Sequence, residues 1–164
     1  MNERVDLFKL GMRRLAAGVS LITTRDAQGR PHGMVATSVT SVCITPPSLL
    51  TCINKTASSH DALASAGIFC VNLLAEGDDE VAMRYSSSRL REMRFGEGTW
   101  GTLETGSPVL DSAIASFDCR VTSTVEASSH TIFIGEVVAV RLREQTTSPL
   151  LYLDGAFARC APAV

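Results

Sequence analysis

The sequence has none of the segments that mark membrane, exported or nucleic-acid-binding proteins. No apolar run approaches the roughly 20 residues that a membrane-spanning helix needs. The charged start MNERVDLFK lacks the apolar centre of a signal peptide. A formal net charge of −2 gives no basic patch for nucleic acid or for an anionic membrane. We therefore expect a cytoplasmic protein that binds neither nucleic acid nor membrane.

Cysteine and histidine patterns typical of metal sites and disulfides are also missing. The five cysteines, at positions 43, 52, 70, 119 and 160, contain no C-x-x-C pair, and their odd number argues against a disulfide framework. The three histidines, at positions 32, 60 and 130, are far apart and have no cysteine at ligand spacing. We expect no metal site and buried, unreactive thiols, with Cys160 the most exposed.

Common signatures of covalent catalysis and of nucleotide binding are absent as well. The chain has no nucleophile elbow, no Ser–His–Asp set and no glycine-rich loop of the P-loop or Rossmann kind. Hydrophobic residues nevertheless make up 45% of the 164 residues and charged ones 20%, which indicates a folded protein with a real core. We expect one domain over residues 1–164.

Strand patterns recur along most of the chain. They predict strands over 19–24, 32–42, 48–53, 68–73, 115–125, 132–142 and 150–153. Helical spacing predicts short helices over 5–15, 59–66 and 78–86, with a further turn over 90–95. The glycine-rich stretch 96–108 is expected to be irregular, either a lid or a variable excursion. Such mostly antiparallel strands close most simply as a mainly-β barrel with helices over its open ends.

The alternation of apolar and polar residues is clearest between positions 115 and 125. Phe117, Cys119 and Val121 fall on one face of the predicted strand. Ser116 and Asp118 fall on the opposite face with further polar residues. The pattern therefore predicts a half-buried strand with one polar face.

The polar segment NKTASSHD, residues 54–61, is the first candidate binding site. Ser58 and Asp61 have the spacing of a capping box that opens a helix. The free N–H groups of such a helix, with the hydroxyls of Thr56 and Ser59 and the charge of Lys55, would suit an anion such as phosphate. The alternative is an ordinary helix cap beside a solvated lysine, with Asp61 competing against any anion. Both interpretations stay open on local chemistry.

Seven segments, in order along the chain, resemble the short-chain flavin reductase family. They are GVSLITT (18–24), HGMVATSVTSV (32–42), ITPPSLLTCINKTAS (44–58), FCVNLL (69–74), ASFDCRV (115–121), SHTIFIGEV (129–137) and LLYLDGAF (150–157). That family includes the reductase components of two-component flavin monooxygenases, such as those acting on 4-hydroxyphenylacetate. The resemblance implies a flavin-binding split β-barrel, and a homodimer in which the partner subunit completes part of the flavin pocket.

The resemblance also implies flavin-binding residues. The candidates for the flavin phosphate are Thr40, Ser41, Lys55, Ser58 and Ser59. The candidates for the edge of the flavin ring, mainly through backbone groups, are Met34, Ala36, Thr37, Ser38, Cys52, Ile53 and Asn54. Small residues in the first of these segments would let backbone amides approach an aromatic ring closely. They would equally suit a tightly packed barrel corner.

Three further side chains match positions in the family's motifs. His130 matches a histidine that lies near the nicotinamide, and it is the candidate catalytic residue, although a solvent-exposed loop histidine is the alternative. The family often has Gly-Asp before this histidine, where this chain has Ser128-Ser129. Tyr152 is a candidate wall of the nicotinamide site, with core packing as the alternative. Arg84 would meet a phosphate or an acidic neighbour.

The function that the resemblance implies is an NAD(P)H:flavin oxidoreductase. It would reduce FMN or FAD with NADH or NADPH and supply diffusible reduced flavin to a separate oxygenase that hydroxylates an aromatic compound. Because the flavin carries the electron chemistry itself, no side-chain nucleophile is needed. One alternative is a flavin-binding barrel that reduces another acceptor, such as a ferric chelate. The other is a protein that binds flavin without turnover.

Overall fold

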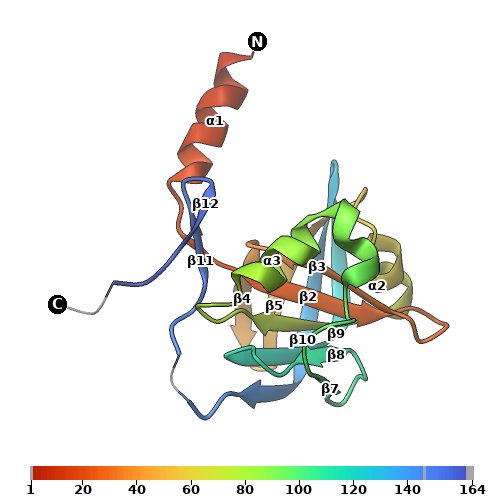
Figure 1. Ribbon diagram of the computed structural model, residues 1–164. Coiled ribbons are helices and arrows are strands. Elements are labelled where there is room, and N and C mark those ends of the chain that lie inside the picture. Colours follow the sequence, from red (N-terminus) through yellow and green to blue (C-terminus); the bar gives the residue numbers. More distant parts are fainter. Residues whose placement is uncertain (1, 146, 162–164) are drawn as a thin grey trace.

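The computed structural model describes residues 2–145 and 147–161 (Figure 1). Strands account for 47% of the chain and helices for 20%, so the expected mainly-β class is confirmed. In chain order the elements are α1 (Glu3–Arg13), β1 (Ala17–Gly18), β2 (Ser20–Arg25), β3 (Pro31–Ala36), β4 (Val39–Ile44), β5 (Pro47–Asn54), α2 (His60–Ala66), β6 (Ile68–Leu73), α3 (Asp79–Ser86), the 3-10 segment η1 (Ser88–Met93), β7 (Trp100–Thr102), β8 (Pro108–Leu110), β9 (Ala115–Ala127), β10 (His130–Leu142), β11 (Leu151–Leu153) and β12 (Ala156–Ala158).

One seven-stranded antiparallel sheet, in the order β3-β2-β6-β9-β10-β5-β4, forms the body of the protein. Its two edge strands, β3 and β4, follow each other in the chain. No ladder joins them within residues 2–145 and 147–161, so the sheet is not closed by hydrogen bonds. The simple closed barrel is thus corrected to an open one, consistent with the split barrel that the family implies.

The single strand expected over 32–42 is two strands. β3 pairs with β2, whereas β4 turns away and pairs with β5. Ser38 lies at the break, where its Oγ donates to the carbonyl of Cys52 at 3.0 Å and accepts from the Cys52 N–H at 3.2 Å. This side chain satisfies backbone groups of β5 that a continuous ladder would otherwise pair.

The polar face predicted for the strand over 115–125 is buried where the strand begins. Ser116 and Asp118 of β9 are both fully buried. Ser116 Oγ donates to Asn72 Oδ1 at 3.0 Å, and Asp118 accepts the Thr105 N–H at 2.7 Å. The segment 96–108, expected to be irregular, supplies β7, which pairs with β8. Because this part of the chain covers the polar face, the buried groups are hydrogen-bonded rather than hydrated.

Two clusters of buried side chains fill the protein. The first lies within the sheet and includes Ile22, Ile53, Phe69 and Phe133. The second includes Leu21, Leu74, Ala82, Tyr85 and Leu110, and it packs α3 against the sheet. The second cluster therefore fixes where α3 and the following η1 lie relative to β3.

The amphipathic helix expected near the N-terminus is confirmed as α1, but none of its residues is buried. It extends away from the body, above the three-stranded sheet β1-β11-β12 (Figure 1). Arg13 at its end bonds to Asp154 through Nε and Oδ1 at 3.1 Å. Strand β12 lies beyond 150–153, the last strand expected from the sequence. The apolar stripe of α1, which includes Phe8 and Leu15, is exposed.

All five cysteines are free, but two are less buried than expected, since Cys43 is exposed and Cys52 is half-buried. Cys70 and Cys119 are buried and Cys160 is exposed, as expected. Cys43 is exposed because β4 is an edge strand with its outer residues in solvent. Among the described residues, no helix is long and apolar enough to cross a membrane, and no His, Cys, Asp and Glu cluster is arranged for a metal ion.

Candidate active site

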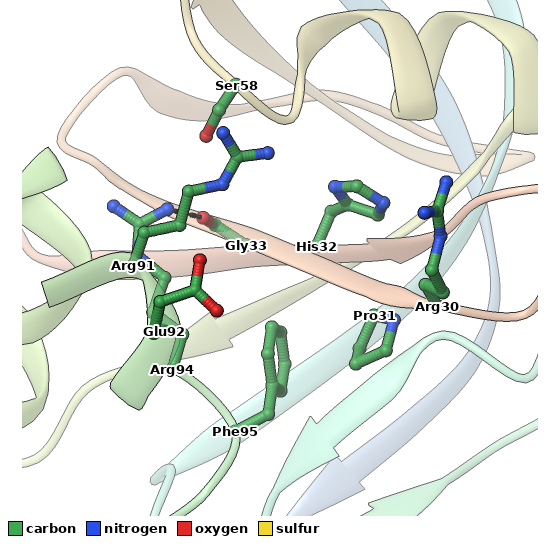
Figure 2. Close-up of a pocket in the computed structure, with 9 residues that line it drawn as sticks. All are labelled: Arg30, Pro31, His32, Gly33, Ser58, Arg91, Glu92, Arg94 and Phe95. Atoms are coloured by element: carbon green, nitrogen blue, oxygen red, sulfur yellow. Dashed lines mark hydrogen bonds between the residues drawn. The ribbon is translucent and has the colours of Figure 1, made fainter.

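Two adjoining hollows lie beside β3, and together they form the candidate site. The Met34 hollow, of about 480 Å³, is lined by Met34, Val35, Thr56, Ala57, Ser58, Tyr85, Ser86, Ser88, Arg91 and Arg94. The His32 hollow, of about 360 Å³ and drawn in Figure 2, is lined by Arg30, Pro31, His32, Gly33, Ser58, Arg91, Glu92, Arg94 and Phe95. Ser58, Arg91 and Arg94 line both, so the two hollows share a polar wall.

Gly33 of β3 lets α3 and the chain after η1 approach the strand closely. A Cβ at this position would lie 2.8 Å from Tyr85 Cε1 and 3.2 Å from Phe95 Cζ. Burial raises the pKa of Tyr85 to about 12, so its hydroxyl stays neutral and accepts the Phe95 N–H at 3.0 Å. The absence of a side chain at Gly33 therefore allows the wall of the hollows to form.

Arg94 joins the three elements around the site. Its Nη1 donates to the carbonyl of Gly33 at 3.1 Å, and its Nη2 donates to the carbonyls of Tyr85 at 2.9 Å and Ser87 at 3.1 Å. The guanidinium also lies 5.4 Å from the centroid of the Tyr85 ring. Burial lowers the pKa of Arg94, but an arginine keeps its charge at neutral pH. All of these partners are neutral, so the charge remains for an anion.

Arg91 adds a second guanidinium to the shared wall. In Figure 2 its side chain extends toward Ser58, near the end of the loop between β5 and α2. Within the part of the chain that the structure describes, neither Arg91 nor Arg94 forms an ion pair with a carboxylate. Two uncompensated guanidiniums beside a serine hydroxyl are the chemistry that binds a phosphate group.

The edge of β3 supplies backbone hydrogen-bonding groups to the Met34 hollow. β3 has a strand partner on its β2 side, and no ladder runs along its other side among the described residues. On the facing strand, β5 pairs with β4 only as far as Thr51, and beyond it the backbone of Cys52 bonds to the Ser38 hydroxyl and the Asn54 carbonyl accepts the Ala57 N–H. The unpaired edge of β3 can donate to and accept from the polar rim of a planar ligand.

The structure separates the five residues expected around a phosphate. Ser58 lies at the shared wall, whereas Thr40 and Ser41 line an apolar hollow of about 440 Å³ on β4. Lys55 forms an ion pair with Glu126 at the end of β9. Ser59 is 3% exposed, and its Oγ has no hydrogen-bond partner among the described residues. Their role in binding phosphate stays a prediction, with Ser58 alone placed beside the arginines.

The expected capping box is wrong. Helix α2 begins at His60, its N-cap is Ser59, and no side chain caps it. Asp61 instead bonds to His60, with Oδ1 and Nδ1 2.9 Å apart. A helix of only seven residues with this start carries no anion site of its own. The loop before it contributes to the site through Ser58 rather than through the helix dipole.

Only some of the residues expected along a flavin ring edge lie at the Met34 hollow. Met34 lines the Met34 hollow, and Ser38 is bonded to Cys52 across the split in the sheet. Asn54 Oδ1 accepts from both the N–H and the hydroxyl of Thr56 at 2.9 Å, which shapes the loop leading to Ser58. The remaining residues place no side chain in the hollow: Ala36 and Ile53 are buried in the core and Thr37 is exposed.

His130 is the first residue of β10, where it pairs with Asn54 of β5. Its Nδ1 lies 3.0 Å from Ser129 Oγ, and the side chain is half-buried. It lines neither of the two hollows but adjoins the loop that forms one end of them. Its catalytic role stays a prediction.

Arg84 and Tyr152 lie on other sides of α3. Arg84 forms an ion pair with Glu97, the acidic neighbour that was its alternative partner. Tyr152 packs edge-on against Phe157, with ring centroids 5.9 Å apart. It lines a shallow hollow that shares Ser86 with the Met34 hollow. Tyr152 therefore lies near the site across one turn of helix, and Arg84 points away from it.

Sequence reasoning missed the two arginines that give the site its charge. Arg91 and Arg94 are three residues apart in RLREMRF, and that spacing was the only available signal. Their common wall with Ser58 depends on the path of η1 over β3, which no local pattern fixes. His32 stands at the start of the family-like motif HGMVATSVTSV, but the motif did not indicate a binding role for it.

Comparison with known proteins agrees with this geometry. Residues 12–161 match the family described as flavin reductase like domain. The chain is 38% identical over 153 residues to the FMN reductase (NADH) RutF 2 of Rhizobium rhizogenes, covering 93% of this chain and 87% of that protein.

Two solved structures share the whole fold. One is the NADH:FAD oxidoreductase SgcE6 of Streptomyces globisporus C-1027 in complex with NAD and FAD fragments, with a TM-score of 0.87, 30% identity, and coverage of 98% of this chain and 94% of that one. The other is BorF, the flavin reductase component of a bacterial two-component tryptophan halogenase, with a TM-score of 0.85, 29% identity, and coverage of 94% and 97%. This chain belongs to the flavin reductase-like family.

Proposed function

We propose that this protein is an NADH-dependent FMN reductase. The observation that carries the proposal is the Met34 hollow, which has an unpaired backbone edge along one side and the Ser58–Arg91–Arg94 wall at one end. These features match the polar rim and the phosphate of FMN, and the named relatives reduce FMN or FAD with NADH. NADH would give a hydride to FMN, solvent would add one proton, and NAD⁺ and reduced FMN would leave.

In this reaction the protein's own residues bind the flavin and orient it. Arg91, Arg94 and Ser58 would hold the phosphate, and the backbone of β3 would hold the ring rim. Arg94 also fixes the wall by bonding to three backbone carbonyls. Since the flavin carries out the electron transfer, the absence of a nucleophile in these hollows is consistent with the reaction.

The reduced flavin would diffuse to a separate oxygenase component that acts on an aromatic compound. The support is that BorF is the reductase of a two-component system. The test separates protein from released flavin by ultrafiltration after anaerobic turnover with NADH and FMN. Reduced FMN in the filtrate is the expected result. Reduced flavin retained by the protein, with electrons passed only to an added ferric chelate, would favour the alternative acceptor, and bound flavin without NADH oxidation would favour a binding protein.

We also propose that the chain is a single domain and that two copies of it form a homodimer. The family match over 12–161 supports the single domain. The exposed apolar residues of α1 and the apolar hollow on β4 support the dimer, because a monomer rarely leaves so much apolar surface in water. Light scattering on a sizing column is expected to give twice the mass of the chain. Location in the cytoplasm stays a prediction from the sequence.

A further inference from the structure

The loop between β5 and α2 carries Ser58, and both of its ends are tied to the hairpin that β9 and β10 form. At the first end, the Lys55 ammonium forms an ion pair with Glu126. At the second end, His60 Nε2 lies 2.9 Å from Thr131 Oγ1. Glu126 and Thr131 are directly opposite each other in the hairpin. The same pair of neighbouring residues therefore anchors both ends of the loop.

Thr131 determines which atom of the histidine donates. The hydrogen bond from Lys55 lowers the pKa of Glu126, so this carboxylate is ionised at neutral pH and can only accept. The single hydrogen of the Thr131 hydroxyl goes to Glu126 Oε1 at 3.2 Å, so the hydroxyl oxygen accepts from His60 Nε2. Thr131 is 3% exposed, which shields this bond from water. The Asp61 carboxylate beside Nδ1 is 99% exposed, so Thr131 is the partner that fixes the ring.

Packing holds the His60 ring in the same orientation. The side chain is only 13% exposed, and its ring packs edge-on against Phe133 of β10 with centroids 5.8 Å apart. Phe133 belongs to the core cluster within the sheet, so the histidine rests on a rigid surface. The His60 N–H donates to the carbonyl of Ala57 at 3.0 Å, which carries this fixed position back into the loop. Ser58 lies between these two bonded residues.

We propose that His60 is a positioning residue for flavin binding, which holds Ser58 at the phosphate wall through its bond to Thr131. His60 does not line either hollow and acts on the ligand only through the loop. The inference rests on the proposed function, because it takes the ligand at this wall to be the phosphate of FMN. The hydrogen bonds themselves need no ligand, so the loop can also be tested without one.

The first test measures hydrogen exchange of the peptide 54–60 in the flavin-free protein. Exchange is expected to be about tenfold faster in His60→Phe, which keeps a ring against Phe133 but cannot donate to Thr131. His60→Gln is expected to exchange as the wild type does, because its amide nitrogen can donate from a similar position. Ser65→Ala is the matched control on α2, since Ser65 is exposed and its hydroxyl donates to the Asp61 carbonyl of the same helix.

The second test is calorimetric titration with FMN and with riboflavin, which has no phosphate. His60→Phe is expected to bind FMN about tenfold more weakly and riboflavin as the wild type does, and His60→Gln to bind both as the wild type does. Thr131→Val removes the same bond from its other side, so the double variant with His60→Phe should be no weaker than either single variant. Glu126→Ala changes an exposed residue that the core does not need, and it is expected to weaken FMN binding about threefold.

Four results would overturn the inference: unchanged exchange of the loop in His60→Phe, equal losses for FMN and riboflavin, no recovery in His60→Gln, or a wild type that binds FMN no better than riboflavin. A histidine with a purely structural role would lower the melting temperature and weaken both ligands alike. The proposed function fails separately, if wild-type protein that binds FMN does not oxidise NADH.

Discussion

The Arg94 guanidinium and the Gly33 carbonyl oxygen lie 3.1 Å apart, and this bond joins the segment after η1 to the edge strand β3. The same arginine donates to carbonyls of α3 and of the residue after it. The glycine has no side chain, which lets the Tyr85 ring reach the strand. The pair therefore links the packing of the fold to the charge of the candidate site.

Arg94→Lys tests whether geometry matters as well as charge. Lysine keeps the positive charge, but its single nitrogen cannot take the places of both Nη1 and Nη2, which reach carbonyls of different elements. We therefore expect the free energy of unfolding to fall by about 2 kcal/mol. We also expect KM for FMN to rise. Urea unfolding and steady-state kinetics measure the two effects. An unchanged stability would contradict the role of Arg94 in joining these elements.

Gly33→Ala tests the close approach of α3 to β3. The added methyl group would lie 2.8 Å from Tyr85 Cε1, so we expect a loss of about 1–3 kcal/mol in unfolding free energy. The control is Gly11→Ala in α1, where nothing lies within 4 Å and alanine favours the helix. Thermal unfolding compares the two variants. If Gly33→Ala is as stable as Gly11→Ala, the contact between Gly33 and Tyr85 is not tight in solution.

Arg91→Ala tests the phosphate site without disturbing the fold. The side chain is exposed and forms no ion pair among the described residues, so the melting temperature should not change. KM for FMN should rise about tenfold, and KM for riboflavin, which has no phosphate, should stay the same. Arg89→Ala is the control on the same segment. Equal effects on FMN and riboflavin would remove Arg91 from the phosphate site.

Asp26→Asn tests the anchoring of Arg30 and His32 through its pH dependence. Asp26 Oδ2 lies 2.8 Å from Arg30 Nε and 3.0 Å from His32 Nε2. Because hydrogen bonds from His32 and Arg30 lower the pKa of Asp26 in the folded protein, its charge stabilises the fold above the usual aspartate pKa of about 3.9, and this contribution is lost as the pH falls below that value. We therefore expect the variant to melt below the wild type at neutral pH, with the gap narrowing in acid. Asp6→Asn on the exposed α1 is the control. A gap that does not depend on pH would argue for a purely steric role.

Phe8→Glu tests the proposed dimer. Phe8 is 66% exposed on α1, so the substitution removes no contact from the core and should leave the stability of the monomer unchanged. We expect the variant dimer to dissociate at a higher protein concentration than the wild-type dimer, as measured by analytical ultracentrifugation. Lys9→Glu on the same helix serves as the control. A variant that associates like the wild type would place the interface elsewhere.

The sequence predicted those features that local patterns determine. The strand Ile68–Leu73 was expected with the observed bounds, and the strand expected over 132–142 is β10, which has a shift of register between Ile134 and Gly135. Gly135 is needed there because a Cβ would lie 2.8 Å from Phe69. Family motifs then predicted the split barrel, because they occur in order along the chain.

Features that depend on long-range packing could not be predicted in this way. Asp118 has the pattern of a solvent-facing residue, and only the chain around Thr105 makes its burial possible. Lys55 has the pattern of a phosphate ligand, yet it meets Glu126, 71 positions further along the chain. Arg91 and Arg94 lie outside every recognised motif, and the path of η1 brings them to Ser58.

The measurement that tests the central claim most directly is the rate of NADH oxidation by the purified protein as FMN is increased. The proposed function predicts a rate that rises with FMN concentration, saturates, and consumes one NADH for each FMN reduced under anaerobic conditions. A rate that stays at the background level with FMN and with FAD would contradict it, and the protein would then be a flavin-binding member of the family without reductase activity.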